Sequence, residues 1–197
     1  MKESFIDKFK DHKACIFGIQ GSGKTVWTKQ LYKNFKKPIV YSINDDDDWS
    51  KQPKVYVYKA NRRKLKEDFD LFIKKCRTWA LQGKIDLIII DEADLFFQSN
   101  WHLNSEMQDL VLNHRHMKVA IWFITRRPQD IPTKIVESSK NLIVYKLEGF
   151  NAIKRFDDIH PKLKELIGKL DFKKYNFVHK EIGEEPTIQK PLNIKKG

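Results

Sequence analysis

The chain has 197 residues, of which 41% are hydrophobic and 32% are charged, and this composition excludes a disordered chain and allows one well-buried domain. No apolar run reaches the roughly 20 residues that a membrane-spanning helix needs, and the charged start lacks a signal-peptide core, so we expect an intracellular protein with no membrane span. The net charge of +12 favours a polyanionic partner such as nucleic acid, although a lysine-rich solvated surface gives the same excess.

Short apolar segments alternate along the chain with longer segments that have helical periodicity. The predicted strands span residues 14–17, 38–42, 55–58, 85–90, 119–124 and 141–145, with a final short strand at 175–180. The predicted helices span residues 24–35, 62–81, 103–114, 133–138 and 160–170. Near-continuous apolar strands separated by helices are typical of an α/β fold with a mostly parallel central sheet flanked by helices.

The domain organisation predicted from this pattern is simple. Residues 1–183 are expected to form a single domain, with a core over residues 14–146 and a small C-terminal extension over 147–183. The segment 184–197 contains lysine and proline and is expected to be a loosely ordered tail.

The first predicted strand runs into the segment "GIQGSGKT", residues 18–25, which matches G-x-x-x-x-G-K-[ST] in full. Glycines let successive backbone N–H groups point at phosphate oxygens, and the following helix adds its positive N-terminal end. Lys24 is expected to reach the β- and γ-phosphates of ATP, and the Thr25 hydroxyl to bind Mg²⁺. A chance glycine-rich turn rarely has the complete pattern, so the sequence predicts a RecA-like P-loop NTPase. The candidate nucleotide contacts are Gly18, Ile19, Gln20, Gly21, Ser22, Gly23, Lys24, Thr25 and Val26.

A second motif, "LIIIDEAD" at residues 87–94, ends an apolar strand in acidic residues. Asp91 is expected to hold the Mg²⁺ through water, as a Walker B aspartate does. Glu92 is placed to polarise a water molecule for attack on the γ-phosphate. A helix cap or a turn explains one acid at a strand end but not this pair beside a full phosphate loop. We therefore expect an ATPase rather than a small-molecule kinase.

A third motif, "HRHMKVAIWFITRRPQDIP" at residues 114–132, places an arginine before an apolar strand and Thr-Arg-Arg-Pro after it. With this motif the chain resembles the HerA–FtsK superfamily of DNA-pumping ATPases over residues 14–145. Within it, the chain looks most like the genome-packaging ATPases of membrane-containing icosahedral viruses. The resemblance implies that Arg115 acts in trans on the nucleotide of a neighbouring subunit; the alternative is a surface arginine at a helix C-terminus.

The chain departs from the superfamily at the position of the γ-phosphate sensor. The family usually has glutamine immediately before the Arg-Pro pair, whereas this chain has Arg126 there. Arg127 matches the arginine of that pair, and Thr125 precedes Arg126. Either Thr125 or Arg126 is therefore a candidate sensor, and the sequence does not choose between them.

The resemblance also implies a function and its partners. It implies a ring of subunits that threads viral double-stranded DNA into a preformed capsid, with capsid or portal vertex proteins as further partners. The expected location is the cytoplasm of the infected host cell, with association with the virion as an alternative. Two other functions stay open: a ring helicase, suggested by the literal "DEAD" at 91–94, and a nucleotide-dependent virion-assembly module.

Three further segments have alternative interpretations. "NDDDDW" at 44–49 is either a metal site or, more simply, a solvated acidic loop. "ANRRKLK" at 60–66 fits a DNA contact and an ordinary solvated face equally well. The aromatic residues of "LFFQSNW" at 95–101 fit core packing better than a subunit contact.

Overall fold

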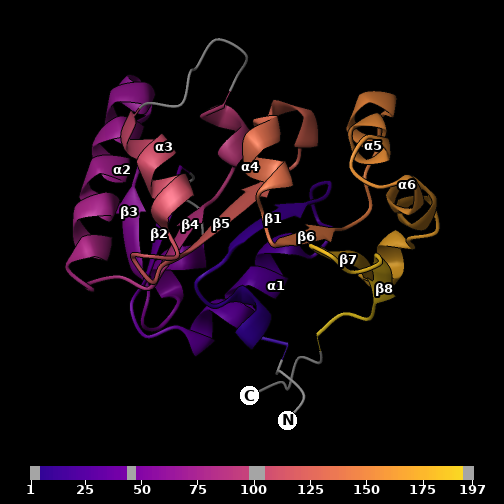
Figure 1. Cartoon of the computed structure of the whole chain (residues 1–197), viewed down its shortest axis with the longest axis horizontal. Coiled ribbons are helices and arrows are strands. Elements are labelled where there is room, and N and C mark those ends of the chain that lie inside the picture. The colour runs from indigo at the N-terminus through magenta and orange to yellow at the C-terminus, as the bar shows by residue number, and fades with distance from the viewer. Residues whose placement is uncertain (1–4, 44–47, 98–104, 193–197) are drawn as a thin grey trace.

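The computed structural model describes residues 5–43, 48–97 and 105–192 (Figure 1). Its strands form an eight-stranded sheet in the order β3-β2-β4-β5-β1-β6-β7-β8. The first six strands pair in parallel, whereas β7 is antiparallel to β6 and β8 is antiparallel to β7. The strands are β1 Lys13–Phe17, β2 Pro38–Ser42, β3 Tyr56–Lys59, β4 Leu87–Ile90, β5 Ala120–Thr125, β6 Asn141–Val144, β7 Phe177–Glu181 and β8 Thr187–Gln189.

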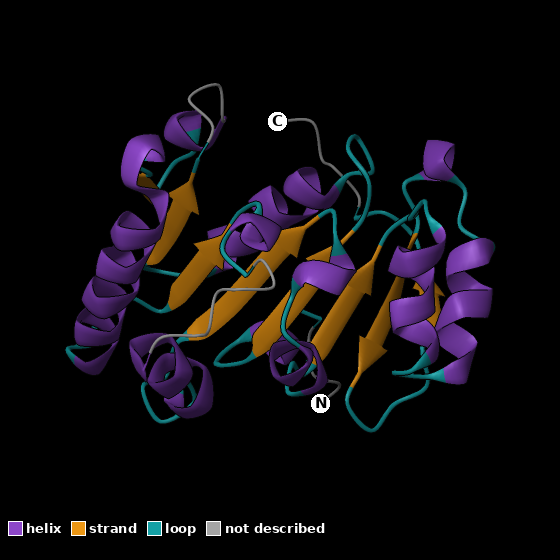
Figure 2. Cartoon of the chain, turned by 90° about the horizontal axis from the view of Figure 1, so that it is seen from above, coloured by secondary structure: helices purple, strands orange, loops and turns teal. Residues whose placement is uncertain are grey.

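Helices cover both faces of this sheet (Figure 2). They are α1 Lys24–Leu31, α2 Leu65–Leu81, α3 Ser105–Asn113, α4 Thr133–Glu137, α5 Phe150–Asp157 and α6 Pro161–Gly168. In Figure 1, α2 and α3 lie at the end of the sheet that carries β3, and α5 and α6 lie at the end that carries β7 and β8. The predicted α/β fold, with a mostly parallel sheet flanked by helices, is confirmed. No helix in the described ranges is both long and apolar enough to span a membrane.

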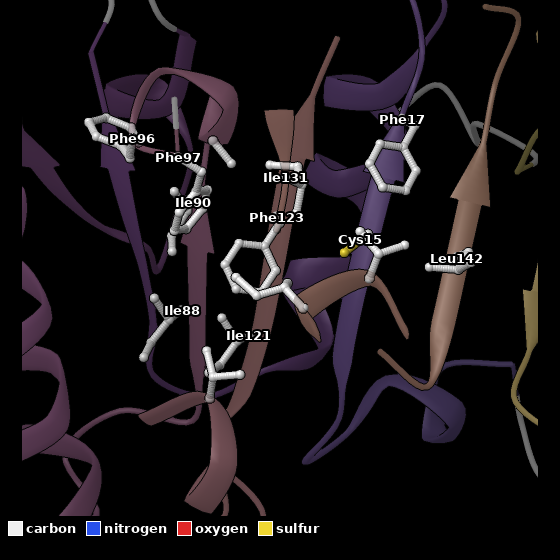
Figure 3. Close-up of a cluster of buried hydrophobic side chains, with 14 of the residues drawn as sticks. Cys15, Phe17, Ile88, Ile90, Phe96, Phe97, Ile121, Phe123, Ile131 and Leu142 are labelled. Carbon is white, nitrogen blue, oxygen red and sulfur yellow. The ribbon is translucent and has the colours of Figure 1, made fainter. Parts of the chain in front are cut away.

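The core consists of two apolar layers, one on each face of the sheet. Alternate side chains of a strand point to opposite faces, so Cys15 and Phe17 of β1 lie with Ile121 and Phe123 of β5 in one layer (Figure 3). Helices α2 to α6 cover that layer. The intervening Ile16 belongs to the other layer, which α1 covers. Since both faces are buried, the central strands are apolar at nearly every position, which is why the sequence reveals them.

The structure differs from the sequence-based expectations mainly after β6. Helix α5 was not predicted; it begins after Gly149 without a side-chain cap, so its start carries no local signal. The segment expected to be a loosely ordered tail contains strand β8, in which Ile188 pairs with Val178 of β7. The three residues of β8 carry no local signal for a strand, because this strand is defined by its pairing with β7. Residues 193–197 of that tail lie outside the described residues.

The first predicted helix, over residues 24–35, is shorter than expected. Helix α1 ends at Leu31 and continues as a 3-10 turn over Tyr32–Asn34. In the aromatic segment 95–101, Phe96 and Phe97 are buried in the core, as core packing predicts. The remainder of that segment, from residue 98, lies outside the described residues, as does most of the acidic loop at 44–49.

Candidate functional site

The phosphate loop connects β1 to α1 at the carboxyl-terminal end of the parallel strands. It is fixed to both neighbouring strands: the Gly18 N–H donates to Thr125 O at 3.3 Å, and the Ile19 N–H donates to Lys146 O at 3.0 Å. Thr125 ends β5, and Lys146 follows β6. The loop is therefore attached directly to the two strands that flank β1.

The glycines of the loop are required by its geometry. A Cβ atom at Gly18 would lie 2.6 Å from both Ser22 Oγ and Tyr145 Cβ, closer than side chains approach one another. Gly23 has φ of +100° at the start of α1, a conformation that residues with a side chain rarely adopt. These positions explain why the sequence pattern needs glycine at both.

Lys24 is buried, with 7% of its surface exposed, and its Nζ donates to Ile19 O at 2.8 Å and also to Gly18 O. The pKa of Lys24 is lowered to about 8, mainly by burial and also by the Arg126 guanidinium, against the opposing effect of nearby carboxylates. Those carboxylates are Asp91, Asp94 and Glu92. The amine is thus folded back on the loop's own carbonyl groups, where a phosphate group is a stronger partner for its charge.

Asp91 follows β4 and is 8% exposed. Its Oδ2 accepts a hydrogen bond from Trp49 Nε1 at 3.0 Å, and its Oδ1 accepts one from the Glu92 N–H at 3.0 Å. The Trp49 ring is fully buried, and Lys29 Nζ of α1 lies 5.3 Å from the ring centroid. Sequence reasoning missed Trp49, because it weighed the acidic residues before it and not the indole that ends that segment.

Glu92 and Arg126 form an ion pair beside the loop. Glu92 has a left-handed backbone, with φ of +52°, and its Oε1 accepts from Arg126 Nη2 at 2.7 Å. Arg126 Nη1 also donates to Gln20 Oε1 of the phosphate loop at 3.3 Å. Arg126 therefore bridges the predicted base and the phosphate loop.

Thr125, the residue before Arg126, is buried. Its hydroxyl donates to Asp94 Oδ1 at 2.7 Å and accepts from the Arg127 N–H at 3.0 Å. The Arg127 guanidinium is exposed and lies 3.8 Å from the Asp130 carboxylate. The structure thus brings both candidate sensors to the carboxyl-terminal end of β5, and of the two it is the Arg126 side chain that contacts Gln20 and Glu92.

The structure does not bring Arg115 to the phosphate loop of its own chain. Arg115 is exposed in the turn between α3 and β5, where the Lys118 N–H donates to Arg115 O at 3.1 Å. This turn precedes the amino-terminal end of β5. Since β1 and β5 are parallel, Arg115 and the loop lie at opposite ends of their strands.

The residues expected to bind Mg²⁺ offer a suitable set of oxygen ligands. Thr25 lies in the first turn of α1 and Asp91 follows β4, and Mg²⁺ is commonly held by one or two protein oxygens together with phosphate oxygens. Among the described residues there is no group of three or more His, Cys, Asp or Glu side chains that could hold a metal ion. Ser22 Oγ is buried without a hydrogen-bond partner in the described part of the chain, which fits a loop built around ligand oxygens.

A cavity of about 570 Å³ opens beside the loop. Residues 21–26 form part of its wall. Sequence reasoning missed the other six lining residues, of which two lie in α1 and four follow β6, far along the chain from the motif. These are Trp27, Gln30, Tyr145, Tyr175, Pro191 and Leu192.

Comparison with known proteins gives one family and several similar structures. The model of the family described as zonular occludens toxin (Zot) matches residues 2–169. No curated protein sequence matches the chain. In the crystal structure of B204, the DNA-packaging ATPase from Sulfolobus turreted icosahedral virus, the match has a TM-score of 0.83 at 19% identity, covering 94% of this chain and 100% of that one.

Two further structures agree with this match. The genome-packaging NTPase B204 from Sulfolobus turreted icosahedral virus 2, in complex with ATP-γS, gives a TM-score of 0.80 at 18% identity, covering 93% of this chain and 98% of that one. The N-terminal domain of zonular occludens toxin from Neisseria meningitidis gives 0.54 at 17% identity, covering 95% and 96%. At these identities the likenesses establish the fold, and the predicted P-loop fold shared with viral packaging ATPases is confirmed.

Proposed function

The chain belongs to the zonular occludens toxin family, and from this premise we propose that it is an ATP-hydrolysing DNA translocase that packages viral double-stranded DNA into a capsid. The observation that carries the proposal is the meeting of the phosphate loop, Asp91, Glu92 and Arg126 at the ends of the neighbouring strands β1, β4 and β5. The likeness in fold to B204, a DNA-packaging ATPase, supports the choice of DNA as the partner, as does the net charge of +12.

In the proposed reaction, water attacks the γ-phosphorus and the bond to the β–γ bridging oxygen breaks. Lys24 binds the β- and γ-phosphate oxygens, and Thr25 and Asp91 hold Mg²⁺, which neutralises charge on those phosphates. Glu92 orients the attacking water and accepts its proton. The products are ADP and inorganic phosphate.

Arg126 is the proposed γ-phosphate sensor. Its guanidinium contacts Glu92 and Gln20, so a γ-phosphate that enters the loop competes directly with Glu92 for the same donors. Binding of the triphosphate then frees the Glu92 carboxylate to accept a proton from water. Thr125 positions this strand end through Asp94 and the Arg127 N–H.

The proposed assembly is a ring of copies of this chain, present in the cytoplasm of an infected cell or at the virion, with capsid or portal proteins as partners. DNA contacts in such a ring fall on phosphates, so binding is expected to show little sequence preference and a steep dependence on salt. A protein that neutralises 6–10 phosphates loses about 10³- to 10⁵-fold in affinity between 50 and 200 mM salt.

The test combines ATP turnover with DNA binding. We expect turnover to rise when double-stranded DNA is added. Lys24→Ala is expected to lose both ATP binding and turnover, whereas Glu92→Gln is expected to bind ATP and not hydrolyse it. Glu137→Gln, an exposed change at the end of α4, serves as the control and should behave as wild type.

Three outcomes would contradict parts of the proposal. Turnover by Glu92→Gln at the wild-type rate would show that Glu92 is not the base. DNA binding that is absent or insensitive to salt would exclude the translocase and favour the virion-assembly module. Separation of the strands of a forked duplex would instead indicate a ring helicase.

A further inference from the structure

The cavity of about 570 Å³ beside the phosphate loop is continuous with the loop itself. Its wall includes Gly21 to Val26, so a group that is joined to phosphates bound in the loop has this space next to it. Ligand pockets in proteins commonly have volumes of about 300–1,000 Å³, and this cavity falls within that range. It therefore has room for the nucleoside part of a nucleoside triphosphate.

The rest of the wall is apolar and aromatic. Within the described part of the chain, Gln30 is the lining residue outside residues 21–26 whose side chain carries an amide, and no charged side chain lines the wall beyond Lys24. A glutamine amide has a carbonyl oxygen and an NH₂ group, so by turning over it can face either a donor or an acceptor on a base. The other lining residues outside the loop are Trp27, Tyr145, Tyr175, Pro191 and Leu192.

Tyr175 is held against the loop by its own backbone turn. It has a left-handed φ of +50° at the end of the 3-10 turn Phe172–Lys174, a conformation that is uncommon for a bulky residue. A Cβ atom at Gly23 would lie 3.4 Å from Tyr175 Cδ1, and one at Gly21 would lie 3.4 Å from Phe172 Cζ. The turn thus places two aromatic rings over the glycines of the loop.

The Tyr175 side chain is nevertheless exposed, since 49% of the residue's surface is accessible. Its ring centroid lies 6.3 Å from that of Phe172, which is also exposed. A flat ligand that covers the Tyr175 ring would explain why a strained turn keeps this ring exposed beside the loop. Aromatic side chains stack on every nucleobase, because each base has a π-face.

We propose that this cavity is the nucleoside subsite, that the base stacks on Tyr175, and that the site therefore takes nucleoside triphosphates with little preference between adenine and guanine. The proposal rests on the proposed function, since it assumes that the loop binds the triphosphate. Stacking depends on the flat shape of a base, and the Gln30 amide can face either a donor or an acceptor. Such a site therefore discriminates weakly between bases with different hydrogen-bonding groups.

The experiment compares the magnesium complexes of ATP, GTP and inorganic tripolyphosphate, which has the phosphates but no nucleoside. Wild-type protein is expected to bind ATP and GTP within threefold of one another. Base stacking contributes enough that Tyr175→Ala should weaken ATP binding by about 5- to 100-fold. Tripolyphosphate binding should stay unchanged, because its contacts are with the loop alone.

Two variants of Tyr175 control for the backbone turn, and a third variant controls for the loss of an exposed ring elsewhere. Tyr175→Gly suits the left-handed conformation and should lose ATP affinity as Tyr175→Ala does, while Tyr175→Phe keeps the ring and should retain it. Phe150→Ala removes an aromatic side chain that is 76% exposed on α5 and does not line the cavity, and it should bind ATP as wild type does.

The outcomes separate this subsite from the function of the loop. Unchanged ATP affinity in Tyr175→Gly would overturn the subsite, and so would an equal loss of ATP and tripolyphosphate affinity. A preference of more than tenfold between ATP and GTP in the wild type would overturn its tolerance of bases. If neither ATP nor tripolyphosphate binds to the wild type, the proposed function fails and the subsite with it.

Discussion

The hydrogen bond from Trp49 to Asp91 supports the predicted Walker B aspartate, and it can be removed without changing the carboxylate. Trp49→Phe keeps an aromatic ring but leaves Asp91 Oδ2 without its indole donor. A hydrogen bond to a charged group contributes about 1.5–3 kcal/mol, so we expect a loss of that order in the free energy of unfolding, measured with urea. We also expect hydrolysis to need a higher Mg²⁺ concentration, because the carboxylate is less well oriented.

A second tryptophan provides the control for this prediction. Trp79→Phe changes a partly buried indole that packs with Tyr56 rather than with Asp91. Its Mg²⁺ dependence should match wild type. An identical Mg²⁺ dependence in Trp49→Phe would show that the hydrogen bond stabilises the fold and does not position Asp91 for the metal.

Arg126 and Thr125 should differ in what their removal changes. Arg126→Ala takes away an exposed side chain, so we expect the stability to be kept and ATP to bind, with kcat reduced tenfold or more if the guanidinium senses the γ-phosphate. Thr125→Val leaves Asp94 and the Arg127 N–H without their shared partner. It should therefore lower the free energy of unfolding by about 1–3 kcal/mol. Urea unfolding and steady-state kinetics distinguish the two, and the reverse pattern would make Thr125 the sensor.

At the scale of the elements, a buried histidine links β7 to β6. His179 Nε2 lies 2.8 Å from Asn141 Oδ1; because the Asn141 amide donates to Lys8 O, its oxygen is the acceptor, and the histidine nitrogen donates. Burial lowers the pKa of His179 to about 4; Glu181 opposes this shift and Lys8 adds to it. The histidine in this strand pair is therefore neutral at neutral pH.

This strand pair should weaken in acid. Between pH 6.5 and pH 4 the unfolded chain binds a proton at His179 that the folded chain does not, so the free energy of unfolding falls as the pH drops through that range. A pKa difference of this size corresponds to at most about 3 kcal/mol at pH 4. His179→Gln keeps a donor for Asn141 and does not titrate, so its stability, followed by urea unfolding at each pH, should fall less steeply. The same slope as wild type would contradict the assignment.

The elements that the sequence predicts well are those whose signals are local. The strands β1, β4 and β5 are continuous apolar runs, and each is followed by its own motif, so the positions of Lys24, Asp91 and Thr125 follow from the order of parallel strands. Trp49 and Tyr175 could not be predicted in the same way. Their positions depend on pairings and turns that bring distant segments together: Trp49 belongs to no periodic pattern, and Tyr175, expected to begin the last strand, instead ends a 3-10 turn before β7.

For the whole molecule, the separation of Arg115 from its own phosphate loop decides where that arginine can act. It lies beyond the amino-terminal end of β5, whereas the loop lies at the carboxyl-terminal end of β1. In a ring, one subunit can present Arg115 to the nucleotide of the next. Removal of such an arginine costs about 10³-fold or more in rate.

Mixing two inactive variants tests this arrangement. Arg115→Ala and Lys24→Ala should each be inactive alone, but a mixed ring contains junctions where an intact loop faces an intact Arg115. We therefore expect partial recovery of ATP turnover on mixing, and a wild-type specific activity that rises with protein concentration. His116→Ala, a change of an exposed neighbour, should stay active. Full activity of Arg115→Ala alone would exclude this role, and no recovery in demonstrated mixed assemblies would direct the same test to Arg126 and Arg127.

The order of the strands in the sheet has a consequence for synthesis of the protein. Translation produces the phosphate loop early, but β1 pairs only with β5 and β6, which the ribosome makes much later, and the cavity also needs Tyr175 and Leu192. A nascent chain that has reached α3 therefore carries the recognisable motif and lacks the neighbours that shape it. Because a ligand stabilises only the state that binds it, we expect nucleotide to stabilise the finished molecule and not the unfinished chain. The phosphate-loop motif is therefore among the first parts of the chain to be synthesised and among the last to acquire its final surroundings.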